Sequence, residues 1–172
     1  MDVLDEEVFA VIMAIVVVAS VVGIAQLIRS EVVEPFTAIG LLNSECRIGD
    51  YPKEVFEGEE LRLCLYLYNH LGRPQLMMVK YKLGDKNVIP TNMTPSPEAP
   101  LKTFKFLLNH GANTTLPVRV PIPLNTELVG KEVALIFELW VYDKDLGEWV
   151  YSGRWVHLYV KMREAPIPWT KS

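Results

Sequence analysis

An uncharged stretch near the N-terminus constrains the fold of this chain more than any other feature. Residues 8–28 contain no Asp, Glu, Lys or Arg and are rich in Val, Ile and Ala. A bilayer core about 30 Å thick is crossed by about 20 apolar residues in a helix. The stretch shows no polar stripe at a 3.6-residue period, which the surface helix of a soluble domain would have. We therefore predict an acidic N-terminus at residues 1–7 and one transmembrane helix at 8–29, where Arg29 reaches the headgroups.

Two other interpretations of this stretch stay open. A cleaved signal peptide fits the small residues Gly23-Ile24-Ala25, although no Lys or Arg precedes the apolar run as in a typical signal peptide. Pilins and archaellins also place an apolar helix before a β domain. They carry a basic residue and a glycine ahead of the helix, where this chain has Asp5-Glu6-Glu7. In a retained helix, Ser20 and Gly23 form a small-x-x-small pair through which it can pack on a neighbouring helix.

The orientation of the predicted anchor rests on opposing signals. Arg29 alone favours a cytoplasmic C-terminal side. The sequons that begin at Asn92 and Asn113 favour an outward-facing domain that can be glycosylated. Cys46 and Cys64 can form one disulfide in an oxidising compartment, or remain two buried thiols. We expect a single-pass protein of the cell membrane with its C-terminal domain outside.

Behind a spacer at residues 30–38, the apolar pattern changes to a period of two. Residues 60–68 alternate, with Leu61, Leu63, Leu65 and Leu67 on one face. The predicted strands are 60–68, 76–83, 101–108, 114–122, 132–142 and 149–162, with an edge strand at Pro117 and Pro121, a hairpin loop at 143–148 and a long loop at 90–100. This pattern predicts an all-β antiparallel Ig-like sandwich at residues 39–163, followed by a Pro-rich tail at 164–172.

Several short stretches of the domain resemble a known family. They are Gly49-Asp50-Tyr51-Pro52, Glu57-Gly58-Glu59-Glu60-Leu61, Tyr68-Asn69-His70-Leu71-Gly72, Leu116-Pro117-Val118 and Phe137-Glu138-Leu139-Trp140. Together they resemble the archaeal membrane-anchored Ig-like family catalogued as domain of unknown function sixteen-sixteen, and more loosely the adhesion-related Ig-like modules of prokaryotic surface proteins. The resemblance covers residues 39–162 and implies a sandwich outside the membrane, without catalytic residues. Many relatives have several spans, whereas this chain has one.

The sequence offers little material for catalysis. The net charge of −4 comes without a basic stripe, which argues against nucleic acid as a partner. No nucleophile elbow, glycine-rich phosphate loop or Cys-x-x-Cys spacing is present. His70 and His110 can meet at a metal, but ordinary turn chemistry explains both. Asp143, Asp145 and Glu148 can surround a calcium ion, but a solvated hairpin tip explains them equally. We therefore predict no enzymatic activity, no cofactor and no small-molecule substrate.

Aromatic residues crowd the predicted C-terminal hairpin. Trp140, Tyr142, Trp149, Tyr151 and Trp155 can stabilise the sheet as cross-strand pairs, or form an exposed surface for a partner. The chain is therefore predicted to be a non-catalytic interaction module, an accessory subunit of a larger membrane complex. Its expected partners are membrane lipid and other membrane or envelope proteins. The alternatives are a structural cell-surface subunit of the pilin or archaellin kind, or a surface module that binds a glycan or a metal.

Overall fold

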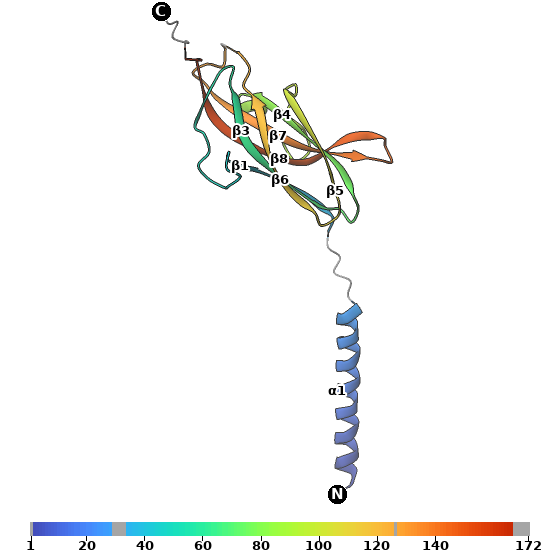
Figure 1. Cartoon of the computed structure of the whole chain (residues 1–172). Coiled ribbons are helices and arrows are strands. Elements are labelled where there is room, and N and C mark those ends of the chain that lie inside the picture. The colour runs from blue at the N-terminus through green and yellow to red at the C-terminus, as the bar shows by residue number, and fades with distance from the viewer. Residues whose placement is uncertain (1, 29–33, 126, 167–172) are drawn as a thin grey trace, which may run out of the picture. The chain divides into compact units, whose positions relative to one another are not determined.

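The chain divides into two compact units, Met1–Glu34 and Pro35–Ser172 (Figure 1). The computed structural model describes residues 2–28, 34–125 and 127–166. The first unit consists of helix α1, Asp2–Ile28. Its stretch Asp5–Gln26 is long and apolar enough to cross a membrane and is not buried within the protein. A signal sequence near the N-terminus can have the same properties.

Helix α1 begins earlier than the predicted span. The acidic residues of 1–7 lie inside its first turns, since negative side chains are favoured near the positive end of a helix. Ser20 bonds back to its own helix, with its Oγ donating to the carbonyl oxygen of Val16 at 2.7 Å. Arg29 and most of the predicted spacer lie outside the described residues.

The second unit is a β domain of eight described strands and one short 3-10 helix. All six strands expected from alternation are present within a few residues of their predicted bounds. The elements are β1 Phe36–Leu42, β2 Glu54–Phe56, β3 Glu60–His70, β4 Gln75–Gly84, η1 Lys86–Val88, β5 Lys102–Leu108, β6 Asn113–Pro121, β7 Glu132–Asp143 and β8 Glu148–Arg163.

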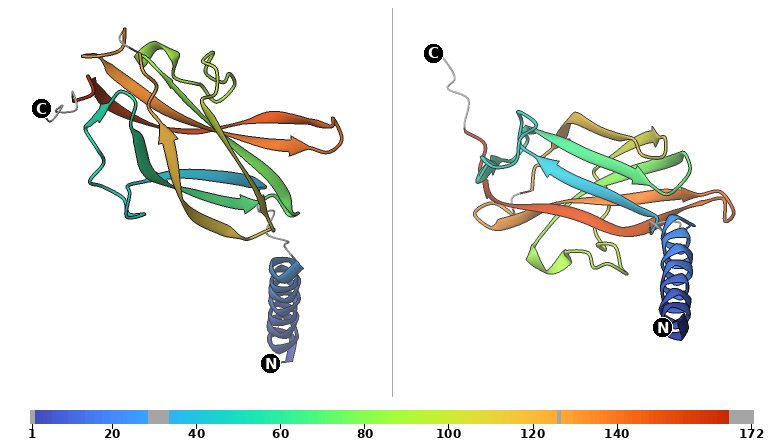
Figure 2. Two further views of the ribbon diagram at one scale, coloured as in Figure 1. Left: turned by 45° about the horizontal axis from the view of Figure 1, so that its top comes forward. Right: turned by 90° about the horizontal axis from the view of Figure 1, so that it is seen from below.

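The strands form two sheets, as Figure 2 shows from two sides. One sheet has three strands in the order β1-β3-β6, and the other has five in the order β2-β8-β7-β4-β5. The proline-bearing β6 is an edge strand, as predicted. Pro117 and Pro121 have no backbone N–H to donate, which an edge strand tolerates and a central strand does not.

Two details of the predicted domain were wrong. Strand β1 begins at Phe36, inside the segment 30–38 predicted as a spacer. The sheets are also not purely antiparallel, because β2 pairs with β8 in parallel. This short strand is fixed at its start, where Lys161 N donates to Lys53 O at 2.9 Å, and by an ion pair between Glu54 and Arg163.

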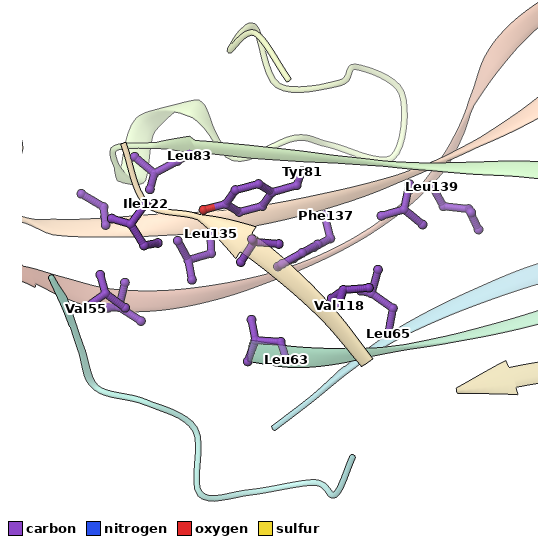
Figure 3. Packing of buried hydrophobic residues seen from close by; sticks show 14 of the residues in the cluster. Val55, Leu63, Leu65, Tyr81, Leu83, Val118, Ile122, Leu135, Phe137 and Leu139 are labelled. Atoms are coloured by element: carbon purple, nitrogen blue, oxygen red, sulfur yellow. The ribbon is translucent and has the colours of Figure 1, made fainter. Parts of the chain in front are cut away.

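Among the described residues, one hydrophobic core lies between the two sheets (Figure 3). Leu63, Leu65 and Leu67 of β3 contribute the predicted apolar face, and all three are buried. From the five-stranded sheet, Tyr81 and Phe137 pack with their ring centroids 5.1 Å apart. Burial raises the pKa of the Tyr81 hydroxyl well above its ordinary value. Its oxygen has no hydrogen-bond partner among the described residues.

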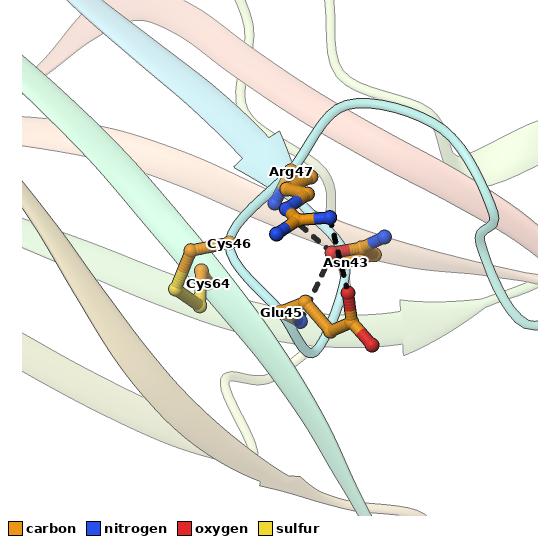
Figure 4. Close-up of a disulfide and its surroundings, with 5 residues drawn as sticks. All are labelled: Asn43, Glu45, Cys46, Arg47 and Cys64. Carbon is orange, nitrogen blue, oxygen red and sulfur yellow. Dashed lines mark hydrogen bonds and ion pairs between the residues drawn. A yellow bond between two sulfur atoms is a disulfide. The ribbon is translucent and has the colours of Figure 1, made fainter.

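A disulfide closes the loop that follows β1. Cys46 and Cys64 are bonded, with their Cα atoms 5.1 Å apart (Figure 4). Asn43 organises the same loop, because its Oδ1 accepts from Glu45 N and Arg47 N, each at 3.0 Å. The loop is therefore linked covalently to β3, in the middle of the three-stranded sheet.

Candidate interaction surface

Alternate residues of β7 point away from the core and define what we call the outer face of the five-stranded sheet. Phe137 and Leu139 belong to the core cluster, whereas Glu138, Trp140 and Tyr142 point to the opposite side. The outer face has two parts. A loop covers the part around Glu138, and the part around Trp140 and Tyr142 is open.

Two aromatic pairs occupy the open part, as the hairpin register requires. Trp140 lies opposite Tyr151, with ring centroids 5.6 Å apart, and Tyr142 lies opposite Trp149, with centroids 5.5 Å apart. The prediction that these residues form cross-strand pairs is confirmed. All four side chains are only partly buried, so they stabilise the hairpin and still present aromatic surface to solvent.

A bulge separates Trp155 from these pairs. Tyr151 faces Trp140 while Arg154 faces Leu139, so Ser152 and Gly153 are extra residues on β8. Ser152 Oγ donates to the Leu139 carbonyl oxygen at 2.6 Å, and Gly153 has a φ of +71°. Insertion of two residues keeps the side-chain alternation.

Trp155 therefore stays on the outer face, opposite Glu138. There it starts a second aromatic row, with ring centroids 5.2 Å from Trp155 to His157 and 4.7 Å from His157 to Tyr159.

The covered part of the outer face is built on a buried ion pair. Lys82 Nζ lies 3.0 Å from Glu138 Oε2, and both side chains are almost fully buried. Ser96, in the loop 89–101, satisfies both charges: its N–H donates to Glu138 Oε1 at 2.6 Å and its carbonyl oxygen accepts from Lys82 Nζ at 2.6 Å. The Trp140 indole N–H donates to Glu138 Oε2 at 3.1 Å. This network fixes the loop on the sheet.

The start of the same loop contacts the bulge on β8. The Tyr151 hydroxyl donates to the Thr91 carbonyl oxygen at 2.8 Å, and a Cβ at Gly153 would lie 2.4 Å from the Asn92 carbonyl oxygen. Burial, with a smaller effect of the Glu138 charge, raises the pKa of Tyr151 to about 12. The Tyr151 hydroxyl therefore remains a donor through the neutral pH range.

Lysine side chains cover part of the open aromatic surface. Lys80 Nζ lies 3.3 Å from the centre of the Trp140 ring, and Lys105 Nζ lies 5.8 Å from that of Trp149. Burial and the nearby charge of Lys82 lower the pKa of Lys80. The open part is thus aromatic and cationic, although the whole chain carries a net charge of −4.

The two histidines considered as metal ligands do meet, at a corner of the domain. The rings of His70 and His110 lie 4.8 Å apart. His110 Nδ1 accepts from Gly72 N at 3.0 Å, which places its proton on Nε2 and leaves no lone pair there for a metal. Asn69 completes the corner by donating to the carbonyl oxygens of Arg73 and Leu108, each at 2.8 Å. Within the described ranges, no three His, Cys, Asp or Glu residues are grouped to hold a metal ion.

The acidic hairpin tip is organised as a turn. Asp143 Oδ1 accepts from Asp145 N at 2.8 Å and from Leu146 N at 3.1 Å. These hydrogen bonds, that from Leu146 first, lower the pKa of Asp143. The Asp143 carboxylate therefore caps the turn.

The remaining predicted site residues lie apart from the aromatic surface or beside it. Asn92 is exposed in the covering loop, and Asn113 is exposed at the start of β6. Apart from its chain neighbours and the helix backbone around it, a Cβ at Gly23 would have no atom within 4 Å. The side of α1 that carries Ser20 and Gly23 is therefore uncovered within its own unit. The sequence alone did not identify Lys80, Lys82 and their partners. They could have been noticed as charged residues within the otherwise apolar strands β4 and β7.

Comparison with known proteins gives no family for the chain. No family model matches it, and no curated protein sequence does. Among solved structures, the sporulation control protein Spo0M from Bacillus subtilis is 18% identical, with a TM-score of 0.45 over 76% of this chain and 50% of that chain. A Listeria innocua β-glucosidase is 14% identical, with a TM-score of 0.44 over 76% of this chain and 16% of that chain. E. coli alpha-2-macroglobulin is 18% identical, with a TM-score of 0.42 over 75% of this chain and 7% of that chain. This chain therefore spans half or less of these proteins, at TM-scores too low to carry an argument about function.

Proposed function

We propose that the chain is a non-catalytic, membrane-anchored interaction module with an Ig-like sandwich outside the cell membrane. It acts as an accessory subunit of a larger membrane protein complex. The observation that carries the proposal is the pair of half-exposed aromatic contacts, Trp140 with Tyr151 and Tyr142 with Trp149, on the open part of the outer face. Tryptophan and tyrosine contribute most to protein interfaces, because they bury large rigid surfaces and keep a polar group.

The outward orientation is supported by the disulfide and the sequons. The bond between Cys46 and Cys64 fits an oxidising compartment. Asn92 and Asn113 are both exposed, as glycosylation requires. The resemblance to the archaeal membrane-anchored family is part of the same proposal.

The absence of catalysis is supported by how the polar groups of the domain are used. The Glu138 carboxylate accepts from Lys82, Ser96 and Trp140 in a buried network. The His110 imidazole accepts a backbone N–H, and the Asp143 carboxylate caps a turn. Each of these side chains holds a loop in place, and none projects a free reactive group into a cavity.

A protein partner fits the open part better than a glycan does. Sugars stack on the flat face of an aromatic ring, and Lys80 already covers a face of Trp140 at 3.3 Å. A protein partner can contact the ring edges and the lysines together. A structural filament subunit would require processing before the apolar helix, so an intact Met1-Asp2 terminus in the mature protein would exclude it.

The proposal is tested by affinity purification of the full chain from native membranes in mild detergent. We expect a second membrane or envelope protein to co-purify in a fixed stoichiometric ratio. Mass spectrometry of the same sample reports the N-terminus, the disulfide and any glycan at the two sequons. A pure monomer in mild detergent, or free thiols at Cys46 and Cys64, would count against the proposal.

A further inference from the structure

A hollow of about 340 Å³ lies beside the open aromatic surface, at the edge of the five-stranded sheet. It is lined by Arg73, Pro74, Gln75, Leu76, Leu107, Tyr142 and Lys144. Leu107 of the edge strand β5 is 70% exposed, and Leu76, opposite it on β4, is 37% exposed. Tyr142 lines the same hollow as this aliphatic pair, and its ring centroid lies 5.5 Å from that of Trp149. Exposed leucines next to Tyr and Trp form a contiguous apolar patch, and such patches mark sites of contact with proteins or membranes.

Cations surround this patch. Arg73 and Lys144 line the hollow, and Lys105 lies over Trp149. Among the described residues, none of the three forms an ion pair. The hairpin beside the patch also carries Asp143, Asp145 and Glu148. The Asp143 carboxylate accepts from the backbone of its own turn, and the charges of Arg73 and Lys144 make a smaller contribution to its lowered pKa. The patch therefore combines apolar and aromatic side chains with cationic side chains that form no direct ion pair among the described residues.

The hollow lies at the end of the domain where the chain enters from the apolar helix. Phe36, the first residue of β1, is paired with His70, and Arg73 follows three positions later in the turn to β4. Six residues, 29–34, separate the end of helix α1 from the start of the second unit at Pro35. An extended chain of this length spans about 20 Å. In an anchored protein, this connection limits how far the entry end can move from the bilayer.

We propose that this patch docks on the surface of the bilayer that holds the anchor, with Leu76 and Leu107 in the interfacial layer and Arg73 and Lys144 on anionic headgroups. The chemistry fits that one occupant. Tyrosine and tryptophan favour the headgroup level, and Lys and Arg near a membrane surface are attracted to anionic headgroups. The inference rests on the membrane anchoring in the proposed function, but not on the existence of a protein partner.

The test uses the full chain in vesicles of phosphatidylcholine, alone or mixed with phosphatidylglycerol, and lipids brominated near the headgroup as quenchers. No tryptophan lies in the apolar helix, and Trp140, Trp149 and Trp155 lie in the β domain. The substitution Trp169→Phe is made in every chain used, so the emission reports on the domain. We expect bromine to quench the emission, and more strongly with phosphatidylglycerol. Leu107→Ser and the double variant Arg73→Gln/Lys144→Gln should each lower the quenching at least twofold.

Leu124→Ser is the matched control. Leu124 is 78% exposed and does not line the hollow. Its side chain lies next to Gly58, which is not part of the patch. We expect this variant to be quenched like the chain that carries Trp169→Phe alone. Because both leucines are largely exposed, neither substitution should disturb folding, and circular dichroism checks this.

The outcomes separate the two proposals. If the chain floats with the vesicles but bromine does not quench its tryptophans, or quenches all variants equally, docking is overturned while anchoring stands. Chemical crosslinking in the same vesicles shows whether two copies of the chain contact each other. If they crosslink and Leu107→Ser removes the crosslinked dimer, the patch binds a second copy of the chain and docking is again overturned. A chain that fails to float overturns the anchoring and the docking with it.

Discussion

The covered and open parts of the outer face use the same sheet for different purposes. Around Glu138, a loop covers the sheet. The buried Glu138 carboxylate pairs with Lys82 and accepts hydrogen bonds from the Ser96 N–H and the Trp140 indole. Further along this face, Trp140 and Tyr142 pack in pairs with Tyr151 and Trp149. The loop reaches this part only at its start, where Thr91 O accepts from the Tyr151 hydroxyl, and all four aromatic side chains remain partly exposed. The difference shows that the domain can cover this face and does so only in part. The open part is therefore the candidate for contact with something outside the chain.

The largest effect is expected from breaking the ion pair. Lys82→Met leaves Glu138 as an uncompensated buried charge, which destabilises a protein by about 3–5 kcal/mol. The double variant Lys82→Met/Glu138→Leu removes both charges and should recover most of that loss. Chemical denaturation of the full chain in detergent measures both. Equal losses in the single and double variants would contradict a role for the pair in holding the loop.

The next effect is expected at the bulge, where the loop approaches β8. Gly153 and Gly147 both have a φ of +71°, but only at Gly153 would a Cβ contact the loop, 2.4 Å from the Asn92 carbonyl oxygen. Gly147→Ala should cost about 1 kcal/mol from backbone strain alone. Gly153→Ala should cost about 3 kcal/mol and raise hydrogen exchange in the loop 89–101. Equal costs would mean that the loop does not contact the bulge in solution.

A smaller effect on stability is expected in the open part. Trp149→Ser removes one aromatic pair and should lower the free energy of unfolding by about 1 kcal/mol. The same variant should lose the co-purifying partner, which the Lys82→Met/Glu138→Leu variant should retain. A folded Trp149→Ser chain that still recovers the partner in the normal ratio would place the interface elsewhere.

The smallest effect is expected from His157, which lies on the outer face beyond Trp155, opposite Ile136. Partial burial lowers its pKa below the ordinary value of 6.5, so the folded state favours the neutral ring. Below pH 6.5 the unfolded chain binds a proton more readily, and stability should fall slightly until the folded-state pKa is reached. His157→Gln should remove this part of the pH dependence. Thermal unfolding between neutral and mildly acid pH compares the two, and identical slopes would contradict a shifted His157 pKa.

Local alternation was enough to predict six strands and the hairpin, because apolar residues at every second position within each strand form its buried face. Strand β1 was not predicted, because it follows Pro35 directly and contains Gly40. Gly40 packs against Tyr66 and interrupts the alternation of apolar and polar residues. The three residues of β2 are a strand only because they pair with β8, more than a hundred positions later. Such a strand has no local signal.

The candidate surface was predictable in its residues but not in its two parts. Alternation placed Trp140 and Tyr142 on one face, and the structure confirms this. The covering of Glu138 depends on Lys82 and on the backbone of Ser96, which are distant in the sequence. The sequence contains the charges, but only the fold shows that they meet and that a loop covers them.

The most direct test compares the two parts in intact membranes. A photocrosslinking residue is placed at Trp149, in the open part, and in a second chain at Met93, which is 86% exposed in the covering loop. An interaction surface restricted to the open part predicts one discrete crosslinked product from position 149 and none from position 93. No product from position 149, or the same product from both positions, would contradict the account.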